Sequence, residues 1–295
     1  MRRSQMLLWF GVALAASART SQAQDCPGVA IGAQGTTTAT AGPPMTDGPH
    51  GGHPATSSAS SGASVPGFNV SAYGSLAVDN GYFESSTHAG GDLDITCCVS
   101  ESAIVRNKGD VTDCLLMGGY NGGGGYLHIP VHVTGTAVAE WSTTSDYQPS
   151  PGAKFAGNQF GVSCYVVVGT KAFACTGGFL EADQDQSVDQ IIELVFPFTF
   201  GASTMFEYVP TANSSLGYAA NGSSGKLSAT GNLFVQAVLE AAYAVDGSGT
   251  PLPNTTIAAS SGFDYFHPVP EASPSALAWA ALASLAALRF RPSRS

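Results

Sequence analysis

The chain has 295 residues, of which only 11% are charged, and its acidic residues outnumber the basic ones by 21 to 11. Between residues 24 and 268 the imbalance grows, because six of the 11 basic residues and only one acid lie outside this range, which leaves 5 − 20 = −15. So acidic a stretch excludes nucleic acid as a partner and excludes charge-driven binding to anionic lipid. Few charges with many Gly, Ser, Thr and Ala residues are typical of extracellular β-proteins.

The N-terminus has the parts of a secretory signal. Two arginines precede an apolar run over residues 6–16, which is too short to span a membrane. Small residues then allow cleavage before Gln24 or, earlier, before Arg19. We therefore predict a signal peptide over residues 1–23 and an exported protein.

Residues 24–65 consist mainly of Gly, Thr, Ala, Ser and Pro, with few large apolar side chains. Such a segment buries too little apolar surface to offset its ordering entropy. We predict a disordered low-complexity linker here, followed by a β-rich domain over residues 66–267.

Strict alternation marks the first clear strand, over residues 126–134. Leu127, Ile129, Val131 and Val133 share one face, while two histidines, at positions 128 and 132, share the other. Pro130 costs this strand a ladder hydrogen bond, so we expect it at a sheet edge or at a bulge. The two histidines would lie about 13 Å apart, too far to bind one metal ion together.

Further strands follow at short spacing. Residues 161–169 and 172–180 predict a hairpin, and residues 188–200 predict a long strand whose alternate phenylalanines enter the core. Residues 227–241 alternate as a strand, with a helix over 233–244 as the rival. Gly-rich residues 118–125 lack the lysine and helix of a phosphate-binding loop and predict a turn. The whole pattern predicts an all-β fold, an antiparallel β-sandwich or a jelly-roll-like domain.

Six cysteines follow the signal peptide, an even number that indicates disulfides in an oxidising compartment. Cys164 and Cys175 lie on adjacent predicted strands and are expected to pair. Cys114 is expected to pair with Cys97 or Cys98, and Cys26 would take the remaining one or stay free.

One acidic segment is a candidate calcium site. Asp183, Asp185 and Asp189 alternate like the oxygen ligands of a calcium-binding loop. Val188 stands where such a loop needs glycine, however, and an acidic turn explains the same residues. No other cofactor is indicated.

The C-terminal tail combines a short motif, Val269-Pro270-Glu271, with an apolar run over residues 276–288 and three arginines, Arg289, Arg291 and Arg294. As a helix the apolar run would span about 20 Å, less than the hydrocarbon core of a bilayer. Residues 268–295 resemble the PEP-CTERM sorting signal, although Ala272 replaces the usual second proline. The resemblance implies a Gram-negative cell surface, an exosortase-like processing enzyme as partner, and membrane contact through this tail alone.

Three functions remain open at this stage. The first is an exported, non-enzymatic surface or matrix protein held near extracellular polysaccharide. The second is a secreted carbohydrate-binding or carbohydrate-active protein, which exposed aromatic residues beside a carboxylate pair would favour. The third is a calcium-stabilised adhesive domain. No G-x-S-x-G elbow or other catalytic motif occurs, and Trp141 is the only tryptophan between the two signals.

Overall fold

Alternating apolar residues determine the architecture. In the computed structural model, β7 (Gly124–Thr143) buries Leu127, Ile129, Val131 and Val133 completely, as the period of two predicts. The structure describes residues 29–39, 44–51, 53–65, 68–95, 100–144, 155–175, 177–182, 185–219 and 225–268.

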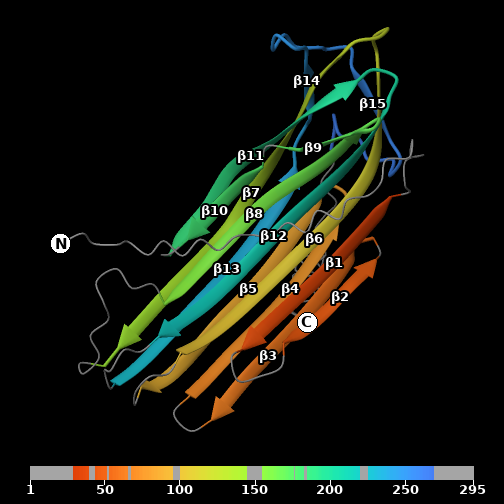
Figure 1. The fold of residues 1–295 in the computed structure, drawn as a ribbon. Coiled ribbons are helices and arrows are strands. Elements are labelled where there is room, and N and C mark those ends of the chain that lie inside the picture. The colour runs from red at the N-terminus through yellow and green to blue at the C-terminus, as the bar shows by residue number, and fades with distance from the viewer. Residues whose placement is uncertain are drawn as a thin grey trace, which may run out of the picture.

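The strands form two antiparallel sheets (Figure 1). In sheet A the main order is β10 (Gly178–Ala182), β8 (Ala156–Val168), β12 (Ser203–Ala219), β6 (Ser100–Gly118), β1 (Ala30–Ala39) and β2 (Met45–Gly51). Two short strands complete it, because β9 (Lys171–Ala174) pairs with β8 and β15 (Thr256–Ala259) pairs with β6.

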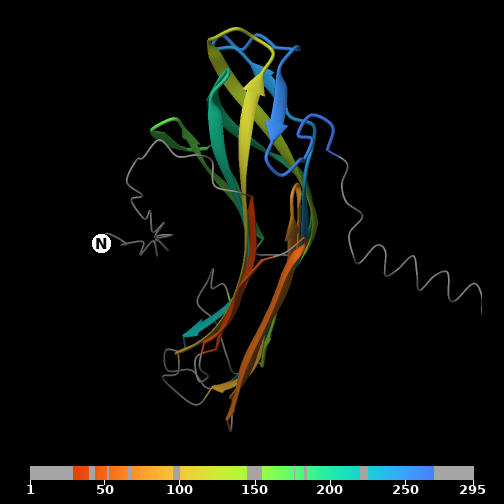
Figure 2. The same ribbon diagram turned by 90° about the vertical axis from the view of Figure 1, so that its right-hand side faces the viewer.

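Sheet B has the order β11 (Gln186–Thr199), β7, β13 (Gly225–Leu239), β5 (Tyr82–Ile95), β4 (Phe68–Asp79) and β3 (Ala55–Val65), and β14 (Tyr243–Val245) pairs with β7. The two sheets lie face to face as long, twisted layers (Figure 2). Strands of matching position contact each other across the interior: β1 lies against β3 and β4, and β12 lies against β5 and β13. The fold is therefore the predicted antiparallel β-sandwich.

The apolar core has two parts. The larger cluster holds most of the aromatic rings, among them Phe196 and Phe206, stacked with centroids 5.2 Å apart. The predicted inward alternation of Phe196, Phe198 and Phe200 is confirmed, since all three are buried. The smaller cluster lies toward the other end of the sandwich and includes Val105 and Leu227.

A belt of polar residues and glycines separates the two clusters. It crosses both sheets at matching positions and consists of Gly35, Thr37, Ser57, Gly74, Ser85, Thr87, Asn107, Asn158, Ser214 and Gly231. Hydrogen bonds connect the sheets across it: Ser214 Oγ lies 2.6 Å from Thr87 Oγ1 and donates to Asn158 Oδ1 at 2.7 Å. The side-chain amide of Asn107 donates to the Ser85 hydroxyl at 2.9 Å. Since an unpaired buried polar group is costly, these bonds disfavour any shift in how the sheets align.

Small residues let the sheets approach closely at the belt. A Cβ atom added to Gly74 would lie 2.6 Å from a methyl group of Val105 and 2.7 Å from Asn107 Oδ1. Both contacts belong to the facing sheet, so no larger side chain fits here without movement.

The structure differs from the predicted linker over residues 24–65. The described residues of this range form β1, β2 and β3, which pair with β6, β1 and β4. The prediction is wrong for these residues because it required large apolar side chains. Where the sheets come close, alanine, glycine and serine fill the interior instead, as Ala33, Ala55 and Ser57 do.

The predicted edge position of Pro130 is also wrong, because β7 lies between β11 and β13. The carbonyl of Pro130 accepts a hydrogen bond from the Glu240 N–H at 2.8 Å, just where β13 ends and before β14 begins. The N–H and C=O of one residue point to the same neighbouring strand in an antiparallel sheet. The nitrogen of Pro130, which carries no hydrogen, therefore faces the break between β13 and β14. No described strand is paired there, so no ladder hydrogen bond is lost.

The remaining strand predictions agree with the structure. Residues 225–239 form strand β13 rather than the rival helix, and Phe234, which broke the alternation, is exposed on the outer face. β8 and β9 form the predicted hairpin around Gly169. The glycine-rich turn separates β6 from β7, and at Gly119 (φ 107°) an added Cβ would lie 1.9 Å from the Asn254 carbonyl oxygen.

Among the described residues there is no helix of sufficient length and apolarity to cross a membrane. The predicted signal peptide, the apolar run over 276–288 and the arginines of the tail lie outside the described residues.

Candidate functional site

The outer face of sheet B carries a group of polar and aromatic side chains that lie near one another at the surface. It lies where β7, β11 and β14 run side by side (Figure 1). We call it the histidine–carboxylate patch, and it consists of His128, His132, Asp189, Glu193, Glu240 and Tyr243.

Strand register assembles the patch. His132 pairs with Ile191 of β11, and Asp189 lies one step along the same outer face, so the two side chains meet diagonally. His128 pairs with Tyr243 of β14, and Glu193 again lies diagonally across from it. These contacts bring together residues that lie 50 or more positions apart in the sequence.

His132 lies between two carboxylates. Its Nε2 is 2.8 Å from Asp189 Oδ1, and its Nδ1 is 3.3 Å from Glu240 Oε1. Asp189 belongs to β11 and Glu240 follows the end of β13, so His132 of β7 connects side chains from three segments of sheet B.

His128 and Tyr243 form the aromatic part of the patch. Their rings stack with centroids 4.6 Å apart and planes inclined by 18°. His128 Nδ1 lies 3.2 Å from Glu193 Oε1, although the angle is too poor for a hydrogen bond, and the Tyr243 hydroxyl donates to the same oxygen. The hydrogen bond to Glu193 raises the pKa of the Tyr243 phenol above its usual value of 10.0, with a smaller contribution from burial.

A second aromatic group lies on the same outer face, nearer to β3. Tyr73 of β4 stacks on His88 of β5 with centroids 4.5 Å apart. His88 Nδ1 is 2.5 Å from Asn232 Oδ1 on β13. Phe234, two residues further along β13, is 40% exposed. Sheet B therefore presents several exposed rings along one surface.

Exposed aromatic and carboxylate groups on this surface could contact a ligand. Tyr243 is 44% exposed and lies beside the Glu193 carboxylate, and an exposed ring next to hydrogen-bonding oxygens suits a hydroxylated ligand. Tyr126, on the same face of β7, is exposed to the same extent. No group of three or more His, Cys, Asp and Glu side chains in the described residues is arranged to hold a metal ion.

Two of the three aspartates of the predicted calcium segment, Asp185 and Asp189, lie in the described residues. β11 begins at Gln186, so Asp189 lies within a strand and contacts His132, whereas Asp185 accepts a hydrogen bond from the Ala139 N–H at 3.1 Å. The two carboxylates thus have different partners, and the calcium site stays a prediction. Asp183 lies outside the described residues.

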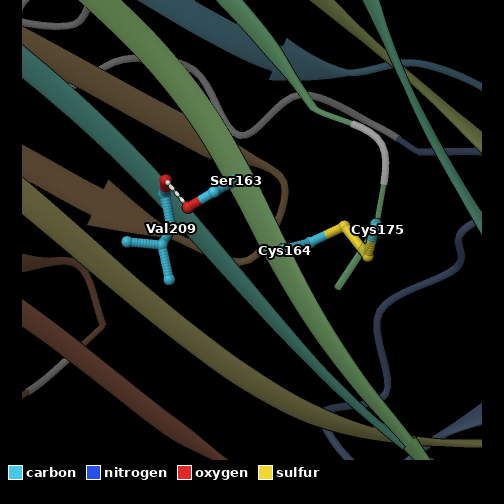
Figure 3. Close-up of a disulfide and its surroundings, with 4 residues drawn as sticks. All are labelled: Ser163, Cys164, Cys175 and Val209. Carbon is cyan, nitrogen blue, oxygen red and sulfur yellow. Dashed lines mark hydrogen bonds between the residues drawn. A yellow bond between two sulfur atoms is a disulfide. The ribbon is translucent and has the colours of Figure 1, made fainter. Parts of the chain in front are cut away.

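The predicted disulfide between Cys164 and Cys175 is confirmed (Figure 3). It connects β8 to the residue after β9, with Cα atoms 5.2 Å apart, and the Cys175 N–H donates to the Cys164 carbonyl at 3.1 Å. On the neighbouring residue, the Ser163 hydroxyl lies 3.5 Å from the Val209 carbonyl oxygen of β12.

The other cysteines are only partly described. Cys114 is buried and is also disulfide-bonded. Cys26, Cys97 and Cys98 lie outside the described residues, so the pairing of Cys114 with Cys97 or Cys98 stays a prediction. The sorting motif Val269-Pro270-Glu271 lies outside them as well.

No protein-family model matches this chain, and no curated protein or solved structure shows significant similarity to it.

Sequence reasoning placed His128 and His132 on one outer face, and the structure confirms that placement. The sequence alone did not indicate the partners of these histidines, Glu193, Glu240 and Tyr243. The long alternation of residues 188–200 placed Glu193 on a strand, but only the pairing of β11 with β7 shows that this strand lies next to the histidines.

Proposed function

We propose that this chain is an exported, non-enzymatic protein of the bacterial cell surface or extracellular matrix. The Cys164–Cys175 disulfide is the observation that carries the proposal, because disulfides persist in oxidising compartments outside the cytosol and are rare within it. The signal-like N-terminus and the motif Val269-Pro270-Glu271 give the same destination independently.

In this proposal the tail delivers the sandwich to the surface. An exosortase-like enzyme recognises the motif and cuts near it, while the apolar run over residues 276–288 holds the precursor in the membrane. The acidic charge of the cargo keeps it soluble by mutual repulsion after release.

Surface delivery is tested by replacing the motif. With P270A and E271A combined, we expect the sandwich to stay in the membrane fraction at full length, whereas the wild type is exposed to added protease on intact cells. The matched control is P274A together with S275A, just outside the motif. Surface exposure that is equal in all three strains contradicts the proposed sorting route.

A second candidate function is carbohydrate binding by the outer face of sheet B. The exposed ring of Tyr243 beside Glu193 favours it, because sugar rings stack on aromatic faces while carboxylates accept hydrogen bonds from hydroxyl groups. This function would explain retention in extracellular polysaccharide after release.

Polysaccharide binding is tested by co-sedimentation with polysaccharide from the host strain. We expect Tyr243→Ala to weaken binding about tenfold or more, as loss of a central aromatic anchor does. The control is Tyr165→Ala, which removes a ring of similar exposure (41%) from sheet A. Equal binding by the two variants excludes this face as the binding site.

A further inference from the structure

Among the described residues, the main strand order of the two sheets ends at four edge strands, β2 and β10 in sheet A and β3 and β11 in sheet B, while the short strands β9, β14 and β15 also pair on one side only. Exposed edges invite pairing with other strands, and proteins block them with charges, prolines, irregular pairing or short length. Three of the four edges are blocked in this way. β11 carries Asp189, Glu193 and Pro197, and β10 has only five residues, with Glu181 among them.

The third blocked edge is β2. It carries Asp47 and His50, its register with β1 is irregular, and Gly48 has a φ of 112°. An added Cβ at Gly48 would lie 2.5 Å from the Ala33 carbonyl oxygen. The backbone of β2 is therefore irregular, and a further strand could not form regular ladder hydrogen bonds with it.

The fourth edge, β3, lacks such protection along most of its length. Its 11 residues, ATSSASSGASV, include no charged residue and no proline. Pairing with β4 is regular from Ala55 to Val65, so the strand is straight enough to accept another. It lies at the margin of the sandwich beside β2 (Figure 1).

One contact shows which backbone groups of β3 face outward. The Ser58 N–H donates to Asp47 Oδ2 at 2.7 Å, which directs it away from β4. Backbone groups alternate in direction along a strand, so the N–H and C=O groups of Ser60, Gly62 and Ser64 face the same side. No described strand pairs with that side.

Asp47 limits how much of this edge is open. Its carboxylate also accepts from the Ser57 hydroxyl at 2.9 Å and contacts His50 at 2.6 Å, and these hydrogen bonds lower the pKa of Asp47 to about 2. The ionised side chain therefore covers the edge at Ser58 and leaves the stretch from Ser60 to Ser64 for pairing.

We propose that β3 pairs with β3 of a second copy of this chain, antiparallel and across a two-fold axis at Gly62. Ser60 then lies opposite the second copy's Ser64, and sheet B continues from one molecule into the other. A second copy is favoured because the stretch of β3 from Ser60 to Ser64 has no charged residue, so like-charge repulsion is small there although the chain is strongly acidic. A two-fold contact also closes after one partner and leaves no further edge of this kind open.

The proposal is independent of the sorting route and of sugar binding, and sedimentation velocity tests it. We expect the purified mature protein to be a dimer in the micromolar range. Replacing Ser60 and Ser64 with lysine sets two positive charges opposite each other across the proposed contact, because Ser60 lies opposite the second copy's Ser64. The substitutions should raise the dimer dissociation constant by about tenfold or more. The control replaces Ser75 and Ser228 with lysine, because both are exposed on interior strands of the same face.

A wild type that stays monomeric, or a lysine variant of β3 that dimerises as the wild type does, overturns the proposal. So does a stable complex of β3 with a different protein in place of the dimer. Because lysine substitutions can unfold a strand, hydrogen exchange of the wild type is measured as well. Amide protection in β3 should fall on dilution, while protection in the interior strand β13 should stay constant; protection in β3 that is independent of concentration also overturns the proposal.

Discussion

The Tyr265 hydroxyl donates a hydrogen bond to Asp113 Oδ2 at 3.0 Å, although the two residues lie 152 positions apart. Asp113 is fully buried on β6 and also accepts hydrogen bonds from the hydroxyl and the N–H of Ser261. Tyr265 is buried as well and packs edge-on against Phe206 and Phe263. The Asp113 carboxylate therefore connects the segment after β15 to the core through hydrogen bonds.

Removing this carboxylate should destabilise the sandwich strongly. We expect Asp113→Ala to lower the free energy of unfolding by about 3 kcal/mol, because it leaves several buried donors without an acceptor. Tyr265→Phe removes one bond and should cost about 1 kcal/mol. Asp110→Ala, on the same strand but with a side chain 40% exposed beside Lys108, is the control and should change stability by less than about 0.5 kcal/mol. Urea unfolding measures all three, and equal losses for Asp113→Ala and Asp110→Ala would refute the role of this buried acceptor.

The disulfide stabilises the β8–β9 hairpin by restricting the unfolded chain. Its cysteines lie 11 positions apart, so replacing both by serine should cost about 3 kcal/mol of unfolding free energy. Adding a reductant to the wild type should cause a loss at least as large, because it also breaks the disulfide of Cys114. A melting temperature that is unchanged in the serine variant would show that the crosslink contributes nothing to stability.

Close approach of the sheets at Gly74 can be tested with one methyl group. Gly74→Ala should lower the free energy of unfolding by about 1–3 kcal/mol, because the new Cβ meets Val105 and Asn107 of the opposite sheet. Gly217→Ala on β12 is the matched control, since nothing lies within 4 Å of an added Cβ there. Thermal unfolding compares the two variants. Similar stability in both would mean that the sheets lie further apart than described.

Titration of Tyr243 tests the geometry of the histidine–carboxylate patch. The phenol's pKa lies above 10.0 because Glu193 accepts its hydrogen bond, so Glu193→Gln should lower this pKa toward its usual value. Since the raised pKa belongs to the folded state, the stability it contributes is present below about pH 10 and is lost as the pH rises through the folded-state value. Absorbance of the phenolate follows the titration. Glu181→Gln on β10 is the control, and an identical shift in both variants would contradict the contact.

Much of the sandwich was predictable from hydrophobic alternation. Leu127 to Val133 and Phe196 to Phe200 repeat with the period of a half-buried strand, and both segments form the strands expected. The Cys164–Cys175 pair was predictable too, because a hairpin places its two cysteines on neighbouring strands.

Strands β1 to β3 were not predicted, because their interior positions hold glycine, alanine, serine and threonine. Small residues carry no periodic signal, and only the facing sheet shows why none larger would fit. The partners of His128 and His132 escaped for another reason. They depend on which strands pair, which cannot be read from the alternation within any single strand.

The central claim, export of a disulfide-containing sandwich through both terminal signals, is tested most directly by intact mass spectrometry of the protein from its host. The account predicts a chain that begins at Gln24 or Arg19, ends near the motif Val269-Pro270-Glu271 and gives no thiol signal from Cys164 or Cys175. A chain of 295 residues recovered from the cytosol with both thiols reduced would contradict it.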